Sequence, residues 1–290
     1  MYKEKQVLLT GALGFTGLHL NNMLVNAGYE VIKLQSNLCN KAELENEIFN
    51  LRPSLVIHLG GISFAGDSKN AKLYSVNVLG TQNLLEALLE IKSDVKKVIL
   101  ASSATIYGEQ HNKVLEESLE PKPVNHYGSS KLSMEIMASI YNKDLPIIIT
   151  RPFNYTGVGQ HEKFVIPKIV KAFANTDKVI ELGNLNVYRE FNDVRDICAV
   201  YKLLLEGPCQ NEIVNICSGK PICLAEVIEL MKGISGYSPE IKINHEFVRV
   251  NEIPILVGNN DRLKNLTGYT FKYSIKQTLT WMFNEFVNTS

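Results

Sequence analysis

A glycine-rich turn between an apolar strand and a helix is the feature that most limits what this chain can fold into. An apolar run at 6–10 enters the turn, a helical pattern leaves it, and a second apolar run ends at residue 34. Glycines let the backbone turn sharply and approach a ligand closely, and the N-terminus of the next helix offers unpaired N–H groups to a pyrophosphate. Within one strand–helix–strand unit, such a turn predicts a dinucleotide-binding site rather than a plain tight turn. The turn residues that we assign to this site are Gly11, Gly14, Phe15, Thr16 and Gly17.

The first half of the chain alternates short apolar segments with helical patterns. The candidate strands are 6–10, 30–34, 55–58, 97–102 and 147–151, and the candidate helices between them are 14–26, 41–51, 70–91 and 127–143. The strands are rich in β-branched residues, as strands buried on both faces should be. The alternation predicts an α/β fold with a doubly wound parallel sheet of the Rossmann type. Ligands of such sheets bind beyond the C-terminal strand ends, so we expect the chemistry there.

The second half has a different texture. Its segments are shorter, turn residues cluster between them, and helical patterns continue at 164–174, 194–206, 224–234 and 275–286. We therefore divide the chain into a dinucleotide-binding Rossmann domain, 1–160, and a smaller substrate lobe, 161–290. We expect the smaller lobe to interleave partly with the domain and to lie over the strand ends.

Composition excludes several classes of protein. Lys+Arg and Asp+Glu both number 30, so no overall field favours nucleic acid or a membrane surface. No apolar run reaches transmembrane length, and the N-terminus lacks the pattern of a signal peptide. The five cysteines form no C-x-x-C and the six histidines form no ligand pair, so we expect neither disulfides nor a metal site. The default expectation is a soluble, cytoplasmic protein.

A tyrosine and a lysine four residues apart suggest proton transfer. Tyr127 and Lys131 share one face of a predicted helix, and an ammonium beside a phenol lowers the pKa of the phenol. Such a tyrosine can exchange a proton with a carbonyl or alcohol oxygen. Ser103, at the end of the fourth predicted strand, can bond the same substrate oxygen. The alternatives are a chance pair and a serine that caps its own backbone.

These motifs together resemble the sugar-nucleotide branch of the extended short-chain dehydrogenase/reductases. The resemblance rests on G-x-x-G-x-x-G, on Ser102-Ser103-Ala-Thr105-Ile-Tyr-Gly, and on Tyr127-x-x-x-Lys131. Further family segments recur in order at 58–61, 77–87, 151–160, 188–196, 249–254 and 261–269, so the resemblance covers nearly the whole chain. The branch includes UDP-galactose 4-epimerase, nucleotide-sugar 4,6-dehydratases and 4-keto-6-deoxysugar reductases. It implies that Ser103, Tyr127 and Lys131 are catalytic.

The resemblance also implies the binding residues. For the cofactor these are the turn residues named above together with Ser36, Asn37, Leu59, Gly60, Gly61, Asn77, Tyr127 and Lys131. For a nucleotide-diphosphate sugar they are Thr105, Asn154, Phe164, Arg189 and Arg249. Asn154, Arg189 and Arg249 fall where the family holds the diphosphate, and the planar arginine fork suits two phosphate oxygens.

The family commonly forms homodimers through two long helices, here 70–91 and 127–143, and we expect the same of this chain. Both segments carry apolar residues beyond one stripe, although these could pack only on their own sheet. The residues are Leu84, Leu85, Leu88, Leu89, Met134, Met137 and Ile140.

The end of the second predicted strand bears on the choice of cofactor. NAD-selective sites usually carry an acidic residue there, which bonds the ribose 2′-OH and repels a 2′-phosphate. This strand ends in Gln35-Ser36-Asn37 and has no carboxylate, which slightly favours NADP(H) over NAD(H). This preference for NADP(H) is modest because no arginine is present at the strand end to hold a 2′-phosphate.

Three family reactions start from the same site. The 4,6-dehydratases carry a Glu two residues after the catalytic hydroxyl, where this chain has Thr105, so that reaction is disfavoured. A 4-epimerase and a 4-ketoreductase both fit the catalytic trio. Segments around 151–160, 183–196 and 252–263 resemble GDP-4-keto-6-deoxymannose reductases most, so we expect a 4-ketoreductase first and an epimerase second. A protein that binds NAD(P) without turnover would have lost one of the trio.

Overall fold

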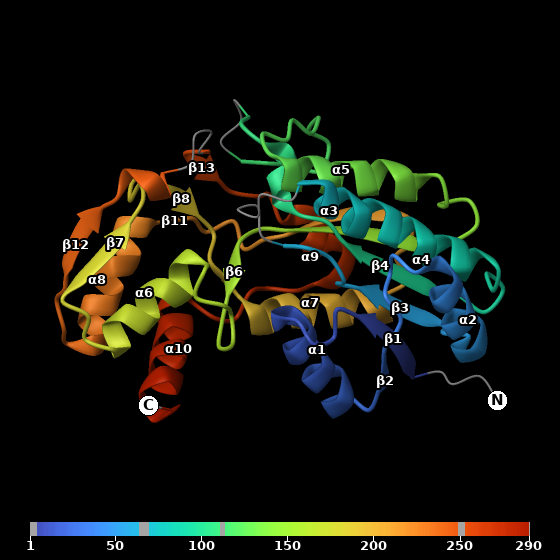
Figure 1. Ribbon diagram of the computed structural model, residues 1–290, viewed down its shortest axis with the longest axis horizontal. Helices are drawn as coiled ribbons and strands as arrows, with labels where there is room; N and C mark the ends of the chain where they lie inside the picture. The colour runs from blue at the N-terminus through green and yellow to red at the C-terminus, as the bar shows by residue number, and fades with distance from the viewer. Residues whose placement is uncertain (1–4, 64–69, 111–113, 249–252, 290) are drawn as a thin grey trace.

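The computed structural model describes residues 5–63, 70–110, 114–248 and 253–289, which form a larger and a smaller lobe (Figure 1). The larger lobe is built on a six-stranded sheet in the order β10-β5-β4-β3-β1-β2, and every neighbouring pair is parallel. Its strands are β1 (Gln6–Thr10), β2 (Glu30–Lys33), β3 (Leu55–His58), β4 (Lys97–Ala101), β5 (Ile147–Pro152) and β10 (Glu212–Ile216). The predicted doubly wound parallel α/β fold is confirmed.

Helices cover both faces of this sheet. On one face α1 (Phe15–Asn26) lies beside α7 (Val194–Glu206), and on the other lie α2 (Lys41–Leu51), α4 (Gly80–Leu89) and α5 (His126–Ser139) (Figure 1). Successive strand residues point to opposite faces, so Leu8 belongs to the core under α2 and α4, whereas Leu9 belongs to the core under α1 and α7. Both leucines are fully buried, which explains why consecutive positions in the middle of β1 are apolar rather than alternating with polar residues.

The predicted helix at 70–91 is formed in three pieces. The short helix α3 (Asn70–Tyr74) runs into a π-helical stretch, η1 (Ser75–Leu79), which continues as α4. A 3-10 turn, η2 (Ala104–Tyr107), follows β4 before the chain reaches α5. The turn η2 therefore lies at the C-terminal edge of the sheet, where β4 ends, and η1 leads into α4.

Parts of the second half of the chain return to the larger lobe. The sequence predicts five strands in the sheet, but β10 adds a sixth by pairing in parallel with β5. Helix α7 packs against α1, and α9 (Asp261–Thr267) packs against both α7 and β10. A division at residue 160 therefore separates the chain in sequence, whereas in space these three elements complete the sheet and its helical layer.

The smaller lobe combines helices with short strand pairs and has a core of its own. Its strand pairs are β7 (Val179–Leu182) with β12 (Glu240–Ile243), β8 (Tyr188–Arg189) between β11 (Ile222–Cys223) and β13 (Ile255–Leu256), and β6 (Tyr155–Thr156) with β9 (Asn192–Asp193). Its helices are α6 (Val165–Ala174), α8 (Leu224–Ser235), α10 (Ile275–Thr289) and the 3-10 turn η3 (His245–Phe247). Ile169, Phe173, Val227 and Leu279 lie in its apolar core.

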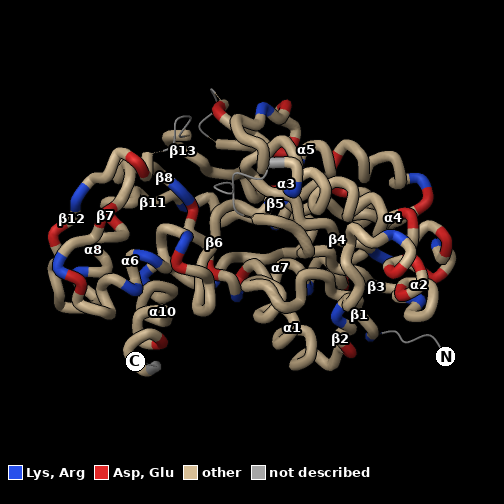
Figure 2. Tube along the Cα trace, in the orientation of Figure 1, with Lys and Arg blue, Asp and Glu red and all other residues tan. Residues whose placement is uncertain are grey.

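Charge is distributed evenly over the fold. Figure 2 shows acidic and basic positions interspersed on both lobes. All five cysteines are free thiols, three of them buried. Within the described ranges, we find no helix that combines the length and the apolarity needed to cross a bilayer.

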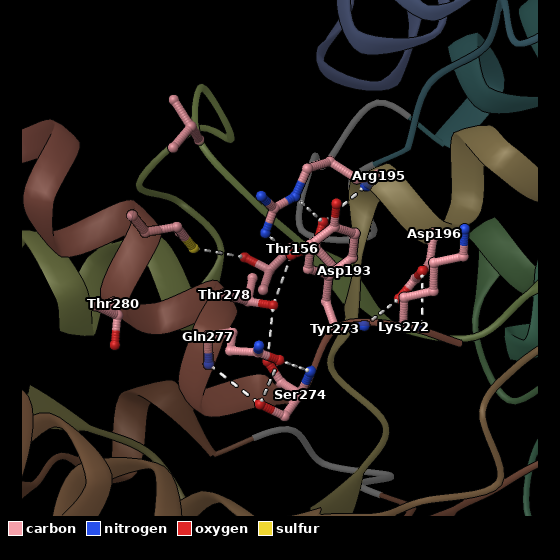
Figure 3. A network of polar contacts seen from close by, with 12 residues as sticks. Thr156, Asp193, Arg195, Asp196, Lys272, Tyr273, Ser274, Gln277, Thr278 and Thr280 are labelled. Atoms are coloured by element: carbon pink, nitrogen blue, oxygen red, sulfur yellow. Dashed lines mark hydrogen bonds and ion pairs between the residues drawn. The ribbon is translucent and has the colours of Figure 1, made fainter. Parts of the chain in front are cut away.

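Two buried carboxylates at the start of α7 tether the C-terminal segment (Figure 3). Asp193 caps the helix, pairs with the Arg195 guanidinium at 2.7 Å, and accepts a 2.7 Å hydrogen bond from Thr278 of α10. Asp196 accepts hydrogen bonds from the Tyr269 hydroxyl at 2.6 Å and from the backbone N–H groups of 272 and 273 at 3.0 and 3.1 Å. Both carboxylates are fully buried, so water does not compete with them as hydrogen-bond acceptors for these donors.

We expect Asp196→Asn to destabilise the protein by about 2–4 kcal/mol, because charge-assisted hydrogen bonds are lost and one buried donor faces an amide N–H. Urea unfolding followed by circular dichroism measures the change. Lys272→Ala is the matched control, because only the backbone N–H of Lys272 bonds Asp196 and its side chain is exposed. A loss in the Asp196 variant no larger than the control's, about 0.5 kcal/mol, would contradict this role.

Candidate active site

The glycine turn closes tightly at the mouth of the sheet. A Cβ atom on Gly17 would lie 2.1 Å from the Gly11 carbonyl oxygen, and one on Gly11, whose φ is +67°, would lie 2.8 Å from the Gly60 nitrogen. Only glycine fits both places. Gly14 precedes α1 without a side-chain cap, and the first turn of α1 carries no acidic residue. The first N–H groups of the helix are therefore offered to an anion.

A buried histidine fixes the loop after β3 beside this turn. The His58 ring bonds Thr10 at 2.7 Å and Thr81 at 2.9 Å, and the Thr10 hydroxyl also accepts from the Gly60 N–H at 2.9 Å. Burial, helped by the Lys131 charge, lowers the pKa of His58 to about 3, so the ring is neutral. Among the described residues, no group of three or more His, Cys, Asp or Glu side chains is arranged to hold a metal ion.

The predicted catalytic residues meet where β4 and β5 end. Ser103 caps η2, and its oxygen accepts from the Thr105 hydroxyl at 2.9 Å. Asn125 caps α5 by accepting from the Gly128 N–H at 2.8 Å, which places Tyr127 and Lys131 in the first turns of that helix. The Lys131 ammonium is buried and donates to the Ala101 carbonyl at 2.7 Å. Strand end, turn and helix thus present all three side chains to one cleft.

The ionisation of this trio differs from the sequence-based expectation. Burial raises the pKa of Tyr127, and its hydrogen bond with Ser103 only partly opposes the shift, so the expectation of a pKa below the ordinary value is wrong. Burial lowers the pKa of Lys131 to about 8, while Glu135, one turn further along α5, acts in the opposite direction. At neutral pH the site therefore combines a protonated phenol with an ammonium ion.

A cleft of about 340 Å³ runs along these strand ends and is lined by most of the predicted site residues. Those that line it are Gly11, Gly14, Phe15, Thr16, Gly17, Leu59, Gly61, Ser103, Thr105, Tyr127, Lys131, Asn154 and Phe164. Asn77 lies behind Gly61, where it accepts from the Ile62 N–H at 2.9 Å and donates to Ser130 at 3.0 Å. Gly60 faces the Thr10 side chain instead.

The end of β2 carries a carboxylate that the strand itself does not supply. Glu47, from α2, accepts from the Gln35 N–H at 3.0 Å and from the Ser36 N–H at 2.7 Å, and the Ser36 hydroxyl also bonds it. Asn37 is exposed, and its side-chain oxygen accepts from the Cys39 N–H at 2.9 Å. The expectation that NADP(H) is favoured rested on a strand end without a carboxylate. In the structure, Glu47 of α2 places a carboxylate at that strand end.

A second cavity, of about 980 Å³, adjoins the cleft and opens between α6 and β7. The two share Asn154, Tyr155, Gln160 and Phe164. Arg189 lines neither; its guanidinium donates to the carbonyl oxygens of Tyr188 at 2.8 Å and Pro254 at 3.2 Å. Arg249 lies outside the described residues. The diphosphate-binding role of these arginines stays a prediction.

The cleft also contains residues that the sequence reasoning missed. Tyr155 stacks on Phe15, with ring centroids 6.0 Å apart, and its hydroxyl bonds Thr16 at 2.7 Å. The sequence signal that could have identified Tyr155 is its position directly after Asn154, in the segment that follows β5. The buried Ser102 hydroxyl oxygen lines the cleft and has no hydrogen-bond partner in the part of the chain that the structure describes.

Comparison with known proteins shows the family. Residues 7–217 match the model of the NAD dependent epimerase/dehydratase family. The chain is 36% identical over 284 residues to GDP-6-deoxy-D-talose 4-dehydrogenase from Aggregatibacter actinomycetemcomitans, covering 96% of this chain and 97% of that one. It is 30% identical to GDP-6-deoxy-D-mannose reductase from Pseudomonas aeruginosa over 290 residues, covering 95% of each.

The fold matches solved structures equally fully. The structure of RMD from Pseudomonas aeruginosa, complexed with NADPH, superimposes with a TM-score of 0.89 at 28% identity, covering 99% of this chain and 100% of that one. The two relatives are thus named for reactions of GDP-linked 6-deoxy sugars, and the solved structure is named as a complex with NADPH.

We expect Lys131 to titrate near pH 8, well below its ordinary value of 10.5, because burial disfavours the ammonium form. NMR of the lysine Cε–Hε groups across pH 6–11, with the resonance assigned through Lys131→Arg, measures the midpoint. Because the unfolded chain keeps this proton up to about pH 10.5, the group makes folding more favourable as pH rises from 8 to 10.5. A midpoint near 10.5 would contradict the burial argument.

Proposed function

Because the chain belongs to the NAD dependent epimerase/dehydratase family, we propose that it reduces the C4 ketone of a GDP-linked 4-keto-6-deoxyhexose with NAD(P)H. The observation that carries this proposal is the cleft in which Ser103, Tyr127 and Lys131 face the glycine turn. The relatives named for reactions of GDP-6-deoxyhexoses support the substrate class. The first of them is named as a 4-dehydrogenase, which is the reverse of reduction at C4.

The residues of the cleft fit a nicotinamide dinucleotide, which supplies the hydride when bound. The backbone cradle at Gly11 and Gly17 has no room for a Cβ, and the uncapped N-terminus of α1 suits a pyrophosphate. Lys131 can donate to ribose hydroxyls, since an ammonium carries three donors and Ala101 uses only one. The unpartnered Ser102 hydroxyl is placed to bond a polar group in the same cleft.

Tyr127 supplies the proton in this proposal. When hydride reaches C4, the carbonyl π electrons move to oxygen, and the phenol gives its proton to that oxygen; the phenolate is then reprotonated from solvent. A tyrosine whose pKa is raised is protonated at neutral pH, as a proton donor must be. The Lys131 ammonium stabilises the phenolate that forms, and Ser103 orients the carbonyl oxygen by a hydrogen bond.

The larger cavity suits the nucleoside diphosphate. It continues from the cleft past Asn154 and Phe164, so a substrate bound across both would place its sugar at Tyr127 and its nucleoside between α6 and β7. Lys168 reaches this cavity with its ammonium 4.0 Å from the centre of the Phe247 ring. Arg189 and Arg249 would grip the diphosphate only if Arg189 leaves the carbonyl groups that it now bonds.

Epimerisation is the competing reaction, since the family takes its name from it and the same trio serves both. An epimerase must first remove a proton from the C4 hydroxyl, for which Tyr127 has to start as phenolate. The raised pKa of Tyr127 favours the reductive direction. Dehydration is disfavoured because Thr105 bonds Ser103 where related dehydratases carry a glutamate.

We expect GDP-linked 4-keto-6-deoxyhexoses to be turned over fastest in a panel that also contains dTDP, CDP and UDP sugars, with one NAD(P)H oxidised per sugar. Tyr127→Phe should lower kcat by about 10²–10⁴-fold and change cofactor affinity by less than about threefold, because only the proton donor is lost. Nicotinamide absorbance and fluorescence titration measure the two effects.

Tyr74→Phe is the matched control, because its hydroxyl bonds His126 beside the same helix and Tyr74 does not line the cleft. Interconversion of sugars without net cofactor oxidation would show an epimerase instead. Full activity of the Tyr127 variant would exclude the mechanism.

We also propose a homodimer. The structure shows which of the apolar residues named for its interface are buried and which are exposed. Leu84, Leu85, Leu88 and Met134 are buried against their own sheet and cannot meet a second copy. Ile140, which directly follows α5, is exposed at 73%, and so are Ile136 in α5 at 62% and Leu79 in η1 at 55%. Ile136 and Ile140, one helical turn apart, form an apolar strip that a second copy of α5 would cover.

We expect Ile140→Glu to convert a dimer into a monomer at micromolar concentration, because the charge would be buried in the interface. Light scattering coupled to gel filtration measures the mass. Val25→Glu, which alters an equally apolar exposed site on α1, should leave the dimer intact. A monomeric unmodified chain would refute the proposal.

A further inference from the structure

The end of β2 forms a small anion-binding site. The backbone N–H groups of Gln35 and Ser36 and the Ser36 hydroxyl all point to the carboxylate of Glu47. Consecutive N–H groups that converge in this way, joined here by a hydroxyl, favour a negatively charged oxygen. The anion is built in, because α2 supplies it from the same chain.

Glu47 is ionised in this position. Burial by itself would raise the pKa of its carboxyl, but the hydrogen bonds from Ser36 and from the two backbone N–H groups outweigh it, and the pKa is lowered. The side chain is only half-buried, so one edge of the carboxylate stays accessible beside the strand end. A ligand that reaches this strand end meets a fixed negative charge.

This strand end is where a Rossmann fold holds the adenosine ribose. β2 is the neighbour of β1, whose glycine turn takes the pyrophosphate, and an acidic side chain after the second strand bonds the ribose 2′-OH in NAD-selective sites. We propose that Glu47 takes over that role from the helix side and makes the chain select NAD(H) against NADP(H). The inference rests on the proposed binding of a nicotinamide dinucleotide in the cleft.

The donors that a 2′-phosphate would need are already used. A phosphate at this place would have to displace Glu47 from the two N–H groups and the Ser36 hydroxyl, and it would then lie beside the displaced charge. Two cations at the ends of α2 are engaged elsewhere. Lys41, in the first turn of α2, pairs with Glu86 at 2.7 Å, and Arg52, beyond the last turn, pairs with Asp94 at 2.6 Å.

Fluorescence titration of the full chain with NADH and with NADPH tests this assignment. We expect the unmodified protein to bind NADH at least about tenfold more tightly than NADPH, since juxtaposed like charges are costly. Glu47→Gln removes the charge and Glu47→Ala also frees the three donors. Each should strengthen NADPH binding by about 10- to 100-fold and weaken NADH binding by less than about tenfold.

Glu45→Gln is the control, because it removes the same charge from the same helix, where Glu45 contacts only the exposed Lys41. It should leave the preference unchanged. Equal affinity of the unmodified chain for NADH and NADPH would overturn the assignment. So would Glu47 variants that keep the unmodified chain's preference for NADH. Either result would leave the proposed reduction standing. Binding of neither dinucleotide would overturn both.

Discussion

The close contact between the glycine turn and the loop after β3 is the constraint on which the rest of the site depends. Gly17 touches the Gly11 carbonyl, and Gly11 touches Gly60, so side chains are excluded from the point where β1 and β3 end. Thr10 and the neutral His58 hold the same contact by hydrogen bonds. Because this meeting point is rigid, the N-terminus of α1 and the first turns of α5 face each other across one narrow cleft.

Helix α5 is held in that position by buried polar groups rather than by apolar packing alone. Glu135 pairs with Arg151 at 2.7 Å, Arg151 also bonds the Tyr107 hydroxyl at 3.0 Å, and all three side chains are buried. A buried pair of this kind adds little net stability, since desolvation offsets much of the attraction, but it permits one geometry only. The register of α5 sets the position of Tyr127. That position matters more for the proposed proton transfer than for the stability of the fold.

The sequence predicted the sheet, the turn and the catalytic trio because each is written in adjacent residues with a fixed period or spacing. It missed what depends on distant segments. β10 joins the sheet from the second half of the chain, and Glu47 reaches the end of β2 from α2. The direction of the Tyr127 pKa also failed, because spacing shows that Lys131 is near but not how deeply the phenol is buried. Which of the apolar residues named for the dimer are exposed likewise needed the structure, since periodicity cannot say whether Met134 or Ile140 faces the sheet.

Lys131 in the cleft and Glu47 at the end of β2 are two charged groups that cannot be interpreted from their own segments alone. In the cleft Lys131 is buried without a carboxylate in direct contact and donates to a backbone carbonyl, so it remains available to hydroxyl groups and to a phenolate. At the end of β2, Glu47 accepts from three donors, which outweigh burial and lower the pKa of its carboxyl. Burial lowers the pKa of Lys131, and hydrogen bonds from the end of β2 outweigh burial at Glu47, so the surroundings of each residue decide the charge that a ligand meets. The end of β2 thus carries an acidic charge that none of its own residues supplies, because α2 provides Glu47.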